Sequence, residues 1–160
     1  MKATLVLSLV MASTFAAAAT AVIVEPSIAF PDGYQRWTRV KTTLVGPQSP
    51  SFATNGGYHH FYANDKAVEG YRTGTFPDGT ILVDDGVMAI ERDGVSREGA
   101  RSRVAVMVKD SRRFGVSNSW GFEVFPGDSR SGSLDGAGKA ACLACHQRAT
   151  RDLVFSELKQ

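Results

Sequence analysis

Cys142, Cys145 and His146 form the pattern Cys-x-x-Cys-His near the C-terminal end of the sequence. In this pattern each thiol can add to one vinyl group of a porphyrin, which gives the thioether bonds of a c-type haem. The adjacent histidine then lies where its imidazole can bind the iron as the proximal ligand. The pattern therefore predicts haem c as the cofactor, with Cys142 and Cys145 holding the porphyrin and His146 holding the iron.

A Cys-x-x-Cys pair also occurs in two other kinds of site. A thioredoxin-like redox pair lies on an early helix that follows a strand, and it needs no histidine beside it. A structural zinc site needs about four ligands, and His59 and His60 are the remaining histidines that could join the pair. Since the chain has 2 cysteines, the haem interpretation uses both and leaves neither for another role.

Residues 1–21 have the pattern of a secretory signal peptide. A basic N-terminus is followed by an apolar run from Leu5 to Phe15 and then by small, mostly alanine residues. The run is too short to span a bilayer, and its alanine-rich end matches a signal-peptidase site. We expect cleavage near Ala19 or Ala21, with an uncleaved anchor as the alternative. Export to the periplasm or beyond agrees with the haem motif, because c-type haem is attached outside the cytoplasm.

The mature chain, residues 22–160, is long enough for a single haem-binding domain with one core. Without Lys2, 17 basic residues face 16 acidic ones. This balance lacks the positive excess that binds nucleic acid or an anionic membrane surface. No later apolar run is long enough to cross a bilayer. We therefore expect no nucleic-acid partner and no membrane span after signal cleavage.

Alternating and β-rich segments indicate that most of the mature chain forms short strands. The expected strands cover residues 58–62, 80–83, 104–108 and 120–125. A helix is expected over residues 65–72, because Asn64 and Gly74 suit its two ends. Residues 34–43 fit either a short helix or the beginning of a strand. The fold class expected is α+β, mainly an antiparallel β-sheet with a few short helices and the haem motif at its C-terminal end.

Three polar segments are expected to lie outside the sheet. Asp84-Asp85-Gly86 has the composition of a turn and would end the strand before it. Residues 92–102 and 127–138 are polar and contain glycine, which predicts loops. The second of these loops leads to the haem motif.

Several short motifs follow one another in an order that resembles a known family. In chain order they are Tyr34-x-x-Trp37; His59-x-Phe61-Tyr62 with Asn64 and Ala67; Gly74-x-Phe76-Pro77-Asp78-Gly79-Thr80; Val108-Lys109-Asp110-Ser111 with Arg113-Phe114; Trp120-Gly121-Phe122-x-x-Phe125; Cys142-x-x-Cys145-His146; and Asp152-x-Val154-Phe155. Over nearly all of the mature chain, this order resembles the cytochrome P460 family, which includes the cytochromes c′-beta.

The resemblance implies a large antiparallel sheet, a homodimer, and a five-coordinate haem whose proximal ligand is the motif histidine. Cytochromes P460 oxidise hydroxylamine and carry a lysine that is cross-linked to the haem edge. Cytochromes c′-beta lack this cross-link and bind nitric oxide and similar small ligands at an apolar distal face. The ligand that the resemblance implies is therefore a small gaseous or nitrogenous molecule.

The sequence departs from the P460 pattern at two positions that concern the haem. The strand that runs into Val-Lys-Glu in P460 enzymes continues here as Val83-Asp84-Asp85, so Asp84 replaces the cross-linking lysine. This replacement favours an uncross-linked haem with Asp84 at its edge; an ordinary turn residue is the alternative. His59 replaces the distal arginine, which makes it a candidate proton-transfer group or sixth iron ligand. The alternative is an ordinary histidine of a half-buried strand, and alternation then places His59 with Phe61 on one face.

The sequence thus predicts a periplasmic or secreted mono-haem c-type cytochrome with an open distal site for nitric oxide or hydroxylamine. If the protein is an enzyme, it oxidises hydroxylamine or reduces nitric oxide or peroxide, with His59 and Asp84 as candidate catalytic residues and another cytochrome as redox partner. Phe61 or Phe76 is the candidate cover of the open side. The alternative is a six-coordinate electron-transfer cytochrome without a substrate. No methionine follows the haem motif, so His59 would have to be the sixth ligand in that case.

Overall fold

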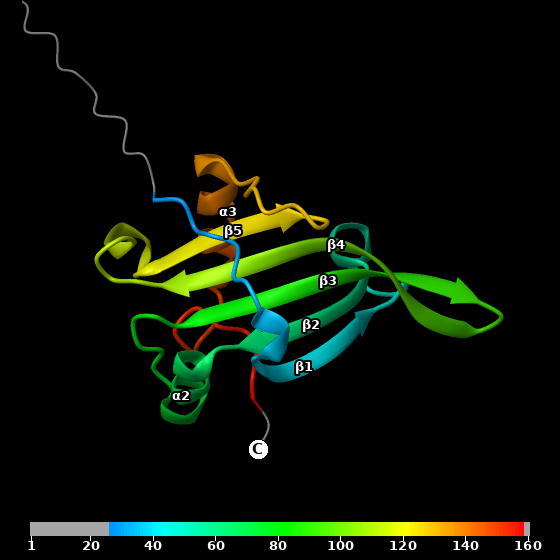
Figure 1. Ribbon diagram of the computed structural model, residues 1–160, viewed down its shortest axis with the longest axis horizontal. Helices are drawn as coiled ribbons and strands as arrows, with labels where there is room; N and C mark the ends of the chain where they lie inside the picture. The colour runs from blue at the N-terminus through cyan, green and yellow to red at the C-terminus, as the bar shows by residue number, and fades with distance from the viewer. Residues whose placement is uncertain (1–25, 159–160) are drawn as a thin grey trace, which may run out of the picture.

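The computed structural model describes residues 26–158, in which 5 strands form one twisted sheet flanked by short helices (Figure 1). The elements in chain order are the 3₁₀ helix η1 (Tyr34–Arg36), β1 (Thr38–Val45), α1 (Phe52–Asn55), β2 (Gly57–Ala63), α2 (Asp65–Thr73), β3 (Ile81–Arg92), β4 (Val95–Lys109), the 3₁₀ helix η2 (Gly115–Ser117), β5 (Trp120–Pro126) and α3 (Gly136–His146). Each strand pairs antiparallel with the next one in sequence. This confirms the expected α+β fold. The predicted signal segment, residues 1–21, lies outside the described residues.

Apolar side chains on the two faces of the sheet form two separate buried clusters. One cluster contains Leu82, Met107 and Phe122 and packs against α3 and the segment that follows it. We call this side of the sheet the α3 face. The next residue along β3, Val83, points to the other side and packs in the second cluster with Tyr34 of the N-terminal segment. In Figure 1 the N-terminal segment crosses the near side of the sheet, while α3 and the C-terminal segment lie behind it.

Local sequence signals determine the ends of α2. The Asn64 side-chain oxygen accepts a hydrogen bond from the Ala67 N–H at 2.9 Å, and Gly74 ends the helix with a φ of 83°. Both caps were expected. Residues 34–43 divide between η1 and β1, so the strand interpretation holds for most of that segment. Among residues 26–158, no helix is long and apolar enough to cross a bilayer.

The turn expected at Asp84-Asp85-Gly86 is wrong, because β3 continues through it. Asp84 pairs with Phe61 of β2, and Asp85 pairs with His60. Both carboxylates find partners on neighbouring elements, and a buried carboxylate with such partners does not need a turn to reach water. The strand therefore carries one acidic side chain to each face of the sheet.

The loop expected over residues 92–102 is also wrong, because most of it belongs to β4. The chain reverses at Asp93 and Gly94, whose φ angles are 53° and 74°. Two successive left-handed residues form the tightest kind of hairpin turn, for which Asp-Gly is a favoured pair. The β3–β4 hairpin extends past the ends of the other strands (Figure 1). We call residues 88–99 the hairpin arm.

Candidate functional site

A cavity of about 640 Å³ lies between the α3 face of the sheet and α3 with the C-terminal segment. This volume is within the roughly 300–1,000 Å³ that small-molecule and cofactor sites occupy. Its apolar lining includes Phe61, Leu82, Met107, Phe122, Val154 and Phe155. Cys142, Cys145 and His146 line the same cavity. The size, the apolar walls and the position of the Cys-x-x-Cys-His residues all fit a porphyrin held from α3.

Strand register divides the α3 face into three rows that run across the sheet. The apolar row consists of Ala63, Leu82, Met107 and Phe122; the middle row of Phe61, Asp84, Ala105 and Val124; and the polar row of His59, Gly86 and Arg103. Successive rows are two residues apart along each strand, which is about 7 Å. The cavity therefore has an apolar end, near the core, and a polar end about two rows away.

Two carboxylates position α3 over the sheet. Glu123 of β5 is buried, and its Oε1 accepts hydrogen bonds from the backbone N–H groups of Val124, Ser133 and Leu134 at 2.9, 3.1 and 3.0 Å. It thereby holds the loop that leads into the helix. Asp135 caps α3 by accepting a hydrogen bond from the Gly138 N–H at 2.7 Å. The two cysteines, three residues apart, then lie on one side of α3.

His146 is held in the tautomer that leaves a lone pair on Nε2. Its Nδ1 donates a hydrogen bond to the carbonyl oxygen of Leu153 at 2.8 Å. Because a carbonyl can only accept, Nδ1 carries the proton and Nε2 keeps its lone pair. Burial lowers the pKa of His146, which favours the neutral ring. Its ring centroid lies 5.1 Å from that of Phe122 and 5.2 Å from that of Phe155.

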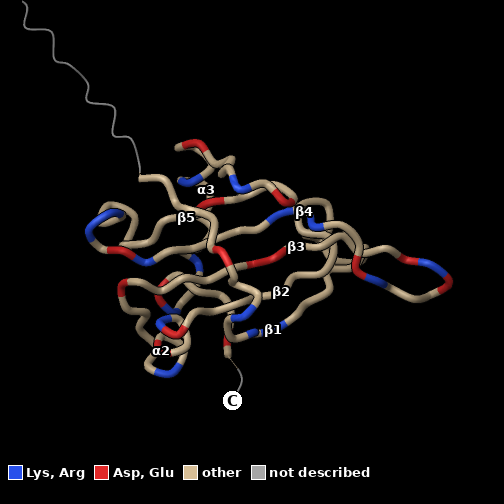
Figure 2. The backbone as a smooth tube through the Cα atoms, in the orientation of Figure 1, with Lys and Arg blue, Asp and Glu red and all other residues tan. Residues whose placement is uncertain are grey.

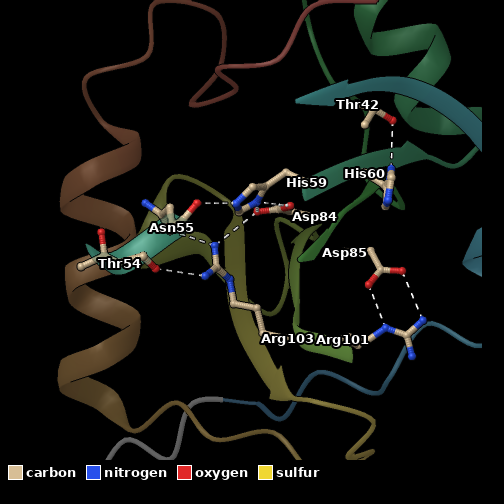
Figure 3. A network of polar contacts seen from close by, with 9 residues as sticks. All are labelled: Thr42, Thr54, Asn55, His59, His60, Asp84, Asp85, Arg101 and Arg103. Atoms are coloured by element: carbon tan, nitrogen blue, oxygen red, sulfur yellow. Dashed lines mark hydrogen bonds and ion pairs between the residues drawn. The ribbon is translucent and has the colours of Figure 1, made fainter. Parts of the chain in front are cut away.

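His59 lies on the cavity wall, and both of its ring nitrogens have partners (Figure 3). Nδ1 lies 2.9 and 3.0 Å from the two carboxylate oxygens of Asp84, and Nε2 lies 2.8 Å from the Asn55 carbonyl oxygen. Since both partners are acceptors, a ring with two N–H groups satisfies them best. The hydrogen bond with Asp84 raises the pKa of His59 and outweighs the opposing effect of burial. Neither nitrogen is free to bind iron in this arrangement.

Arg103 and Asn55 complete the polar end of the cavity, and sequence reasoning missed both. Arg103 Nη2 donates a hydrogen bond to Asn55 Oδ1 at 2.9 Å and forms an ion pair with Asp84 at 3.5 Å. Its Nη1 lies 3.4 Å from the Thr54 carbonyl oxygen (Figure 3). Arg103 was overlooked because the segment before it was expected to be a loop. Read as a strand, the alternation of residues 103, 105 and 107 would have placed it on the cavity side.

The neighbouring residues His60 and Asp85 lie on the other face of the sheet, where each has partners of its own (Figure 3). His60 Nδ1 lies 2.9 Å from Thr42 Oγ1. Asp85 accepts hydrogen bonds from the Tyr34 hydroxyl at 2.6 Å and from Arg101 Nε at 2.8 Å. The alternation expected for the His59-His60 pair is therefore correct, and it separates the two histidines.

Of the two aromatic residues considered as a cover, Phe61 lines the cavity and Phe76 does not. Phe76 is 2% exposed and packs in the core against Trp120, with ring centroids 5.9 Å apart. Lys41 of β1 is the one lysine among the described residues that line the cavity, and its Nζ lies 5.0 Å from the Phe61 ring centroid. The sequence reasoning, which followed β3 alone, gave no role to Lys41.

A comparison with protein families agrees with the site. Residues 31–156 match the family model described as cytochrome P460. The comparison with curated proteins returned no match. Within residues 26–158, no group of three or more His, Cys, Asp or Glu side chains is arranged to hold a metal ion by itself.

The His59–Asp84 pair should make folding stability depend on pH. Asp84 raises the pKa of His59 in the folded protein. The pair therefore adds its full contribution to folding stability below the ordinary histidine pKa, and this contribution disappears as pH rises through the raised pKa. In urea unfolding we expect the stability advantage of wild type over His59→Gln to be largest below the ordinary histidine pKa of about 6.5 and to shrink as pH rises above it. In an Asp84→Asn background the same comparison should show a weaker pH dependence. An equal dependence in both backgrounds would contradict the pairing.

Proposed function

The chain belongs to the cytochrome P460 family, and from this premise we propose an exported mono-haem c-type cytochrome with an open iron position for a small nitrogen-containing ligand. Membership of this family means a haem-binding cytochrome; the c-type attachment and the ligand are our proposal. The observation that best supports this proposal is that Cys142, Cys145 and His146 line the same cavity as the apolar side chains of the α3 face. Export is supported by the signal pattern of residues 1–21.

We propose that Cys142 and Cys145 hold the porphyrin through thioethers and that His146 Nε2 binds the iron. The position of the cysteines on the cavity side of α3 supports the attachment. The hydrogen bond from His146 Nδ1 to Leu153 supports the ligation, because it leaves Nε2 as the metal-binding atom. When bound, haem supplies one-electron chemistry at iron and an axial position for an exogenous ligand.

The state of His59 supports an open position opposite His146. Ligation by His59 would require loss of its hydrogen bond to Asn55 and of the pairing of a protonated ring with Asp84. Phe61, in the neighbouring row, presents an apolar surface instead. A small uncharged ligand such as nitric oxide or hydroxylamine suits a site that combines an apolar wall with a polar end nearby.

His59 is the candidate proton-transfer residue if the protein turns over a substrate such as hydroxylamine, nitric oxide or peroxide. A protonated ring could give up a proton to a bound ligand, and Asp84 would then keep the neutral ring oriented through Nδ1. The positive charge of Arg103 attracts the Asp84 carboxylate and opposes a positive charge on His59, so it favours release of the His59 proton. Electrons would come from or go to another cytochrome acting as redox partner.

Mass spectrometry of peptides from the holoprotein tests the attachment and the cross-link together. We expect the peptide with Cys142 and Cys145 to carry the mass of haem. The peptide with Lys41 should be unmodified, because Asp84 occupies the position of the cross-linking lysine. Haem that extracts freely into acid–acetone would contradict thioether attachment, and a haem-linked Lys41 peptide would contradict the absence of a cross-link.

Carbon monoxide binding to the ferrous protein tests the open position. The observed rate should rise in proportion to the ligand concentration, because no protein ligand has to dissociate first. His59→Ala should change ligand affinity and leave haem attachment intact. His60→Ala, on the same strand but the opposite face, is the matched control and should leave binding unchanged. A rate that reaches a plateau in wild type but not in His59→Ala would favour the six-coordinate electron carrier.

We also propose a homodimer formed through the hairpin arm. The arm exposes Met88, Ile90 and Val95, which are 49%, 54% and 48% exposed, and apolar side chains on a projecting hairpin are a surface that a second copy can cover. The double variant Met88→Ser/Ile90→Ser should halve the mass found by light scattering. Val116→Ser, which changes an 89% exposed apolar residue off the arm, is the control. A wild-type monomer, or a double variant that stays dimeric, would contradict this arrangement.

A further inference from the structure

The segment after the haem motif contains a strained turn. Arg151 and Val154 form an antiparallel bridge, and the Val154 N–H donates a hydrogen bond to the Arg151 carbonyl oxygen at 2.9 Å. The two residues between them, Asp152 and Leu153, have φ angles of 49° and 64°. Such a turn favours Asn-Gly or Asp-Gly, because a side chain at φ above zero crowds the backbone. Leucine in the second position therefore needs support from the surrounding structure.

The Asp152 carboxylate supplies that support through bonds to two strands and one loop. Lys109, at the end of β4, donates to its two oxygens at 2.7 and 2.6 Å. Trp120 Nε1, at the start of β5, donates to Oδ1 at 3.1 Å, and the backbone N–H of Phe76 donates to Oδ2 at 3.1 Å. The Lys109 and Asp152 side chains are 14% and 20% exposed, so water competes weakly for these bonds.

The held turn presents one backbone group to the haem site. The Leu153 carbonyl oxygen, directly after Asp152, accepts the hydrogen bond from His146 Nδ1 at 2.8 Å. Leu153 itself is 9% exposed and packs in the core cluster of the α3 face. The direction of this carbonyl is therefore set by a turn whose conformation depends on Asp152.

We propose that Asp152 is a positioning residue for His146: it holds the Leu153 carbonyl against Nδ1 and thereby controls how strongly the imidazole donates electrons to iron. The inference rests on the proposed role of His146 as the iron ligand. A hydrogen bond accepted from Nδ1–H makes Nε2 more basic. A more basic ligand favours ferric iron, so the turn keeps the midpoint potential low.

The test uses resonance Raman spectra and redox titration of the haem-loaded protein. In Asp152→Ala we expect the iron–histidine stretching band of the ferrous protein at lower frequency and a more positive midpoint potential. Asp152→Asn keeps the side-chain size and one acceptor oxygen but loses the charge that holds Lys109, so it should shift both quantities in the same direction by less. If Asp152→Ala does not yield folded protein, the result for Asp152→Asn alone tests the proposal.

Asp78→Ala is the matched control. Asp78 also joins two loops, accepting hydrogen bonds from the Ser111 N–H at 3.0 Å and the Ser111 hydroxyl at 2.5 Å. Its loss should lower the urea midpoint without moving the band or the potential. If wild type shows the band and Asp152→Asn leaves both quantities unchanged, the inference about Asp152 is overturned while His146 remains the ligand. If wild type shows no such band, the role of His146 fails, and the inference that rests on it fails too.

Discussion

A shift of β2 by one residue against β3 would turn His59 and Phe61 to the face of the sheet opposite Asp84 and away from α3. The same shift would bring His60 and Tyr62 to the α3 face instead, because side chains alternate between the two faces of a sheet. The pairing register is therefore the constraint on which the site depends. Burial specifies it on both faces, since each face carries its own apolar cluster. Lys, Arg, Asp and Glu occur on β1, β3, β4 and β5 but not on β2 (Figure 2), and the face on which each of them lies follows from the strand register.

The two walls of the cavity are positioned by different means. The sheet wall is fixed by strand pairing, and its rows pass from apolar to polar over about 14 Å. The helix wall is fixed by buried or partly buried carboxylates: Glu123 before α3, and Asp152 after it. Both carboxylates accept hydrogen bonds from several donors, and so each cost of burial is offset by charge-assisted bonds. A motif of five residues thus depends on anchors that lie outside it.

Local signals were sufficient for the parts of the fold that local interactions determine. Asn64 and Gly74 predicted both ends of α2, and the Cys-x-x-Cys-His motif marked the segment that lines the cavity. Asp84 and Asp85 misled the prediction because their partners lie up to 51 residues away, as for Tyr34 and Asp85. A short stretch of sequence around Asp84 and Asp85 does not contain such distant partners. The hairpin was different, since Asp93-Gly94 was present as a signal and was absorbed into a supposed loop.

The site was predicted in its components but not in its arrangement. His59 and Asp84 were chosen as separate positions, and the structure joins them at 2.9 Å. That contact changes the chemistry expected of His59. A ring whose two nitrogens both donate hydrogen bonds has no lone pair with which to accept a proton or bind iron. Arg103 and Asn55 could not be connected to it without the register of β3 with β4 and the position of α1.

The absorption spectrum of the ferrous protein, recorded without added ligand, tests the central claim most directly. The account predicts an uncross-linked, five-coordinate, high-spin c-type haem, with an ordinary Soret band and a single broad visible band. A strongly red-shifted Soret band of the kind that gives cytochromes P460 their name would contradict the uncross-linked haem. Sharp, split visible bands of a low-spin haem would contradict the open position.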